Sequence, residues 1–137
     1  MPDVIRDTHA MLAGMKPVLT PGEFVFCTTR DAELIARIGA SALGWFREDE
    51  GTALVLTRND AKSLGFDDGM PMRRIVLEVF SALDGIGLTA SVAVALAAQG
   101  IACNMIAGYH HDHVFVPSAM AERAVAVLRE LQTRAKS

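Results

Sequence analysis

The residues best suited to hold a ligand form one short loop, Asp84-Gly85-Ile86-Gly87, directly before an apolar stretch from Leu88 to Gln99. Glycine has no β-carbon, so two glycines let backbone amides come close to a ligand. The apolar stretch is expected to be a helix, and a helix N-terminus favours an anion. An amino-acid carboxylate fits that environment, and Asp84 could pair with an α-amino group or cap the turn. A plain strand-to-helix turn explains the same residues, and both interpretations stay open.

A second candidate is Asn104, which lies between Cys103 and Met105 in an apolar, strand-like stretch. Its side-chain amide could hold a ligand amide or carboxylate. It could equally bond neighbouring backbone at a sheet edge or face solvent, because buried polar groups need hydrogen-bond partners.

The densest polar cluster is His110-His111-Asp112-His113, which holds three of the four histidines. On a strand His111 and His113 would share a face, and this permits a transition-metal site. A zinc site normally needs a third or fourth ligand. At a hairpin tip the same residues would be turn formers, with Asp112 bonding its own backbone, or would gate a ligand.

Composition narrows the class of protein. The chain has 137 residues, its 13 Lys and Arg are scattered and its net charge is -3, so neither nucleic acid nor an anionic membrane is an expected partner. The most apolar stretch, Leu88 to Ala98, is too short to span a bilayer. Cys27 and Cys103 lack CxxC spacing and indicate buried thiols in a reducing cytosol. No serine lies in a G-x-S-x-G turn, so nucleophilic catalysis has little support. A cytoplasmic protein without a cofactor is expected.

The hydrophobic pattern predicts the same order of elements twice, after an N-terminal helix within residues 3–12. Each half has the order β-α-β-β-α, and the expected elements are 23–28, 31–39, 43–48, 52–57 and 59–64 in the first half, then 73–80, 88–99, 101–109, 114–116 and a last helix from 118. Asn59 and Ser118 are the expected caps of the helices that they open. This order predicts an α+β, ferredoxin-like fold, with helices on one face of antiparallel sheet. Each half lacks the usual last strand, so two halves or two chains must complete each other's sheets.

Several of these segments resemble an ACT domain. The stretch from Ser81 to Ala90, the small-residue helix to Gly100 and the Ile-x-x-Asn-x-Ile strand ending at Ile106 recur in ACT modules. The regulatory domains of aspartate kinases are the nearest type. The segments 108–117 and 48–56 are similar to an uncharacterised bacterial family of short proteins with two ACT-like domains.

This resemblance covers roughly residues 17–131. It favours an N-terminal extension at 1–16, a first ACT-like half at 17–70 and a second at 71–137. ACT modules commonly bind amino acids at an interface between two modules and do not themselves catalyse reactions. The resemblance therefore implies a ligand beside Asp84, Gly85, Ile86, Gly87, Leu88, Thr89, Asn104, Met105 and Ile106. No catalytic domain is expected beside the two halves, so any output would pass to a separate protein.

The leading hypothesis is a non-catalytic protein that binds or senses an amino acid and forms a homodimer. Unfinished sheet edges need covering, and Val92, Ala93, Leu96 and Ala97 offer a small-residue helix surface for close packing. Two alternatives stay open. One is a metal-binding protein or enzyme that uses the His110–His113 cluster. The other is a structural module whose sheet edges bind a partner protein.

Overall fold

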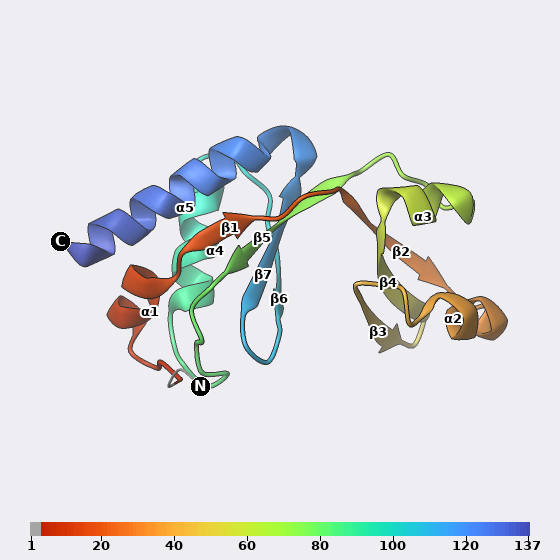
Figure 1. Ribbon diagram of the computed structural model, residues 1–137, viewed down its shortest axis with the longest axis horizontal. Coiled ribbons are helices and arrows are strands. Elements are labelled where there is room, and N and C mark those ends of the chain that lie inside the picture. Colours follow the sequence, from red (N-terminus) through yellow and green to blue (C-terminus); the bar gives the residue numbers. More distant parts are fainter. Residues whose placement is uncertain (1–3) are drawn as a thin grey trace. The chain divides into compact units, whose positions relative to one another are not determined.

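The computed structural model describes residues 4–137, which form two compact units (Figure 1). The first unit combines the chain up to Pro21 with Arg73–Ser137, and the second is Gly22–Met72. Both repeats have the predicted order β-α-β-β-α, with antiparallel hairpins and packed helices. The predicted fold class is therefore confirmed.

The second unit is built on three antiparallel strands. β4 lies between β2 and β3, and Phe24 of β2 also pairs with Met72. Alternate strand residues and the two helices form its core, around Val25, Leu54 and Leu56. Its elements are β2 (Phe24–Thr29), α2 (Ala32–Ile38), β3 (Gly44–Glu48), β4 (Gly51–Thr57) and α3 (Arg58–Ser63).

The strand-to-helix connection of the second unit is short and closed by its own side chains. The Asp31 carboxylate accepts hydrogen bonds from two amides in the first turn of α2, at 3.1 and 3.2 Å. The adjacent Arg30 donates from Nε to the Glu50 carbonyl at 2.8 Å and from Nη2 to the Asp49 carbonyl at 3.2 Å. Asp31 thus satisfies amides that have no acceptor inside the helix, and Arg30 ties the connection to the β3–β4 hairpin.

The cap of α3 differs from the sequence prediction. Thr57 accepts from the Asp60 amide at 3.2 Å, and Asn59 is already inside the helix. The helix begins earlier than expected because β4 runs into it without an intervening loop. The helix ends at Ser63, close to the predicted end at residue 64, and Gly65 follows with a φ of 81° that suits glycine.

The first unit has strand order β1-β5-β7-β6, with β1 antiparallel to β5 and β6 antiparallel to β7. Pro17 begins β1, a strand that is absent from the elements predicted from the sequence. Proline is compatible with the first position of an edge strand. The second repeat lies in this first unit, and β1 supplies the strand that the repeat lacks by pairing with β5. The elements are α1 (Thr8–Gly14), β1 (Pro17–Leu19), β5 (Met72–Leu77), α4 (Leu88–Ala98), β6 (Asn104–Ala107), β7 (Asp112–Pro117), a 3₁₀ turn (Ser118–Met120) and α5 (Ala121–Lys136).

Helices α1, α4 and α5 cover one face of this sheet and enclose its core (Figure 1). Val92 and Leu96 are fully buried there, so they do not form the open helix surface that the sequence analysis assigned to dimer packing. Ser118 does not cap α5. It lies in the 3₁₀ turn, and Met120 occupies the position before the helix. The buried residues of this core are Met11, Met15, Ile75, Leu77, Val79, Leu88, Val92, Leu96, Ile101, Val114, Val116, Ala121, Ala124, Val125 and Leu128.

Candidate functional site

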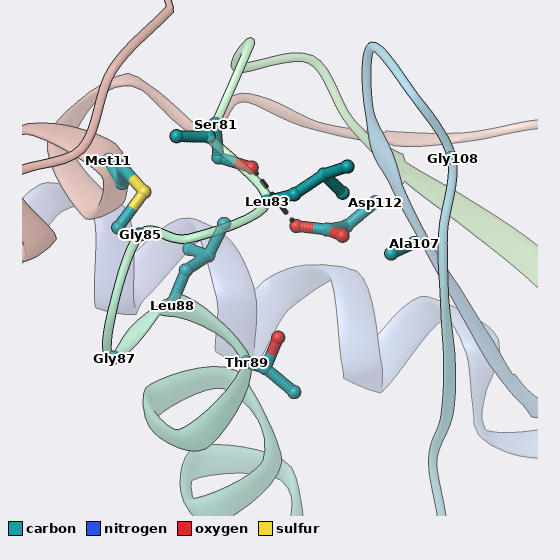
Figure 2. A pocket seen from close by; sticks show the side chains of 11 residues that line it. Met11, Ser81, Leu83, Gly85, Gly87, Leu88, Thr89, Ala107, Gly108 and Asp112 are labelled. Carbon is teal, nitrogen blue, oxygen red and sulfur yellow. Dashed lines mark hydrogen bonds between the residues drawn. The ribbon is translucent and has the colours of Figure 1, made fainter.

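A cavity of about 120 Å³ lies beside the start of α4, within the first unit (Figure 2). The β5–α4 loop forms one wall and the β6–β7 hairpin forms the other, while α1 contributes one residue. The residues that line the cavity are Met11, Ser81, Ala82, Leu83, Gly85, Gly87, Leu88, Thr89, Ala107, Gly108 and Asp112.

The N-terminus of α4 opens toward this cavity. Gly87 occupies the N-cap position with a φ of 107° and has no side chain with which to cap the helix. The first amides of a helix have no intrahelical acceptors and carry a partial positive charge. Buried Leu88 anchors the first turn in the core, and the Thr89 hydroxyl lies on the cavity side (Figure 2). This wall of the cavity therefore favours an anionic group.

Asp112 provides the opposite electrostatic character. Residues of a strand alternate between faces, so Asp112 shares the helix-facing side of β7 with Val114 and Val116, which are fully buried. Its Oδ2 accepts a hydrogen bond from the Ser81 hydroxyl at 3.2 Å. A carboxylate has acceptor capacity beyond one such bond. Figure 2 shows Thr89 at the start of α4 and Asp112 on the hairpin side, so the helix N-terminus and a carboxylate both border this cavity.

The loop residues proposed from the sequence divide into two groups. Asp84 and Ile86 point away: both are exposed, and Asp84 Oδ1 accepts from Arg6 Nε at 3.1 Å. The proposed strand residues lie in β6, and the last residue of that strand, Ala107, borders the cavity. The loop residues that line the cavity are Gly85, Gly87, Leu88 and Thr89, and the strand residues that lie outside the lining are Asn104, Met105 and Ile106.

The histidine cluster is arranged differently from the sequence expectation for a turn. The hairpin closes with a hydrogen bond from the Gly108 amide to the His111 carbonyl, 2.9 Å, which leaves Tyr109 and His110 at the tip. The ring of Phe80 lies 5.4 Å from that of His110. Asp112 bonds to Ser81 instead of to its own backbone. Within residues 4–137, no three His, Cys, Asp or Glu side chains are placed to hold a metal ion together.

Burial lowers the pKa of His113, and the nearby charges of Arg74 and His111 lower it further, while Asp112 acts in the opposite direction. Burial raises the pKa of Cys27 and of Cys103, and both are free thiols. Protonated thiols are weak nucleophiles. Among the described helices, none has the length and apolar character needed to cross a membrane.

Sequence reasoning did not assign Asp112, Ser81 or Met11 to the ligand site. The sequence 112–116 could have indicated the position of Asp112. Along a strand Asp112 lies on the same face as Val114 and Val116, and both valines belong to the core. Ser81 and Met11 carried no such signal, because their positions depend on contacts between distant segments.

Family comparisons agree with the fold. One ACT domain model matches residues 4–73 and a second matches residues 72–130. The chain belongs to the ACT domain family. The two matches show a tandem of ACT domains and confirm the resemblance to ACT domains inferred from the sequence.

Among solved structures, one protein is similar to this chain in both sequence and fold, and two others are similar in fold. A protein of unknown function from Vibrio cholerae, described as a possible transport protein, is 39% identical, with 88% of this chain and 92% of that chain covered and a TM-score of 0.79. A protein from Agrobacterium tumefaciens is 19% identical, with coverage of 85% and 87% and a TM-score of 0.60. Aspartokinase alpha and beta subunits are 16% identical, with coverage of 84% and 95% and a TM-score of 0.60. The last two share the fold.

No curated protein matches the chain. ACT domains are regulatory, non-catalytic modules that generally bind small molecules such as amino acids.

Proposed function

We propose that this tandem ACT protein is a non-catalytic sensor that binds a free amino acid in the cavity beside α4. The observation that carries the proposal is the pairing of an uncapped helix N-terminus with the Asp112 carboxylate across one cavity. An amino acid at neutral pH carries a carboxylate and an ammonium group, which match the two walls. Charge-assisted hydrogen bonds of this kind are roughly twice as strong as neutral ones.

The second unit supports this choice of ligand, because its own side chains make the corresponding contacts. There the Asp31 carboxylate caps α2, and the Arg30 guanidinium donates to the tip of the β3–β4 hairpin. In the first unit the helix begins at an uncapped glycine and the hairpin presents Asp112 instead. A ligand with one carboxylate and one ammonium group would supply both missing partners.

The proposal includes a homodimer. Leu83, which lines the cavity, is 73% exposed, and two further large apolar side chains of the loop and the hairpin tip are strongly exposed: Ile86 is 81% exposed and Tyr109 72%. Exposed apolar groups gathered around a polar opening are typical of interaction surfaces. A second copy covering this surface would close the cavity around its ligand, and occupancy would then favour the assembled state. Free thiols at Cys27 and Cys103 are in keeping with a cytoplasmic location, and a separate protein would receive the signal.

Isothermal titration calorimetry on the full chain tests the ligand class. The twenty amino acids are screened first by thermal shift. For the best small amino acid, alanine for example, the analogues propionate and alaninamide each lack one charged group. We expect both analogues to bind at least about tenfold more weakly, since each leaves one wall without its partner. A chain that no amino acid stabilises would contradict the proposed function.

Light scattering tests the assembly separately. A dimer is expected at high micromolar concentration, and Leu83→Ser should shift it toward monomer because it removes an exposed apolar contact. Val94→Ser is the matched control, since Val94 is 68% exposed but lies midway along α4, away from the cavity. A wild-type chain that stays monomeric would remove the dimer from the proposal.

A further inference from the structure

The loop that forms the ligand cavity is held by a segment far away in sequence, Ile5–Met11. The Ile5 amide donates to the Phe80 carbonyl at 2.8 Å, and the Ile5 carbonyl accepts from the Ala82 amide at 2.8 Å. These two bonds form a parallel bridge between Ile5 and Ser81. The Ser81 hydroxyl donates a hydrogen bond to Asp112. The N-terminal segment therefore fixes the backbone position of the residue that holds Asp112.

Two further contacts continue along the loop toward α4. Arg6 forms its ion pair with Asp84 at 3.1 Å, and the Thr8 hydroxyl donates to the Ile86 carbonyl. A β-carbon placed on Gly87 would lie 2.6 Å from Thr8 Cγ2. The loop is therefore fixed against α1 along its whole length, up to the residue that opens the helix N-terminus.

Met11 forms the part of this segment that reaches the cavity itself. Its side chain is 1% exposed, lines the cavity and belongs to the core of the first unit. Its Sδ and Cε atoms are each 3.2 Å from the point where a β-carbon on Gly85 would lie. Met11 consequently fills the space behind the loop, and a ligand side chain cannot extend in that direction.

We infer that Met11 sets the size limit of the ligand, so that the cavity admits amino acids with small side chains and rejects branched or aromatic ones. This inference rests on the proposed function of the same cavity. The cavity volume of about 120 Å³ is below the about 300–1,000 Å³ that is typical of ligand pockets. An alanine or serine side chain directed toward Gly85 is compatible with that space, whereas a leucine or phenylalanine side chain in the same direction requires the wall behind Gly85 to recede.

The test is a change of preference in Met11→Ala. Affinities for glycine, alanine, α-aminobutyrate, leucine and phenylalanine are measured by calorimetry on the full chain. The wild type should prefer alanine over leucine by tenfold or more, since each extra methylene changes selectivity by about 10-fold to 200-fold. Met11→Ala removes three non-hydrogen atoms behind the loop and should reduce the alanine-to-leucine ratio by about tenfold.

Met15→Ala is the matched control. Met15 lies beyond α1, is fully buried in the same core and does not line the cavity. It should lower Tm as Met11→Ala does, because both open a void in the core, but it should keep the wild-type ratio. If Met11→Ala does not fold, Met11→Val removes less volume and should shift the ratio in the same direction.

The outcomes separate the two proposals. A wild type that binds none of the probes contradicts the proposed function, and the size limit falls with it. Amino acids that bind with an unchanged alanine-to-leucine ratio in a folded Met11 variant overturn the size limit alone. A ratio that changes equally in Met15→Ala shows a general effect of core loosening and also overturns it.

Discussion

The two repeats share their order of elements but differ in the connection from the first strand to the first helix. In the second unit residues 30–31 make this connection, and Asp31 caps the helix that follows. In the first unit the connection covers residues 78–87 and ends at Gly87, which cannot cap a helix. The longer loop lines the cavity opposite residues of the β6–β7 hairpin and packs against Thr8 and Met11 of α1.

This difference lies in how the first amides of each helix are satisfied. A helix N-terminus must have its amides satisfied by a side chain, water or a ligand. The second unit uses its own carboxylate and gains stability. The first unit leaves the position open, and we propose that a ligand takes it.

Asp112→Asn should reduce affinity for alanine roughly 100-fold, since truncating one member of a buried, hydrogen-bonded charge pair costs about 2–5 kcal/mol. The measurement is calorimetric titration. Asp84→Asn is the control and should stay within about threefold of wild type, because Asp84 is exposed and paired with Arg6. Similar losses in both variants would contradict the assignment of Asp112 as the ammonium partner.

Gly87→Ala should lower the free energy of unfolding by about 2 kcal/mol. A left-handed residue with a β-carbon costs roughly 1 kcal/mol, and crowding of Thr8 at 2.6 Å adds a similar amount. Gly65 in the second unit also has a positive φ, 81°, but a β-carbon there would meet nothing within 4 Å. Gly65→Ala should therefore lower the free energy of unfolding by only about 1 kcal/mol. Urea denaturation measures both, and equal losses would show that the contact with Thr8 does not constrain the loop.

Asp31→Ala should lower the free energy of unfolding by about 1 kcal/mol, because two amides of α2 lose their acceptor. Affinity for alanine should not change, since the residues that line the cavity all belong to the first unit. Thermal unfolding and titration of the same sample check both statements. A loss of affinity would show that the second unit takes part in the binding site.

The smallest effect concerns pH. The pKa of His113 lies below its usual 6.5 because of burial and the charges of Arg74 and His111. Below about pH 6.5 the unfolded chain therefore takes up a proton that the folded chain does not, and stability should fall as pH decreases. His113→Gln should weaken this dependence in urea denaturation between about pH 8 and about pH 5. The exposed His9→Gln is the control, and identical slopes in wild type and His113→Gln would contradict the prediction.

Much of the fold was predictable because it depends on local patterns. The order β-α-β-β-α follows from hydrophobic periodicity and from Gly65, which ends α3 where the sequence indicates. The short strand β1 was missed because its two flanking prolines are typical of irregular structure, and only pairing with β5 makes it a strand. The caps at Asn59 and Ser118 were misplaced because neighbouring elements extend further than propensity indicates.

The candidate site shows the same division. The sequence by itself determined that a glycine-containing turn opens an apolar helix, because glycine and the hydrophobic run are local properties of residues 85–98. That no side chain caps this helix is seen only in the structure. It offered Asp84 as the acidic partner and placed Asp112 only in the histidine cluster. The tertiary structure separates these two carboxylates: Asp84 pairs with Arg6 on the surface, while Asp112 accepts from the Ser81 hydroxyl and lines the cavity. Met11 joined the site only through packing, since the contact between α1 and the loop spans most of the chain and has no local pattern that encodes it.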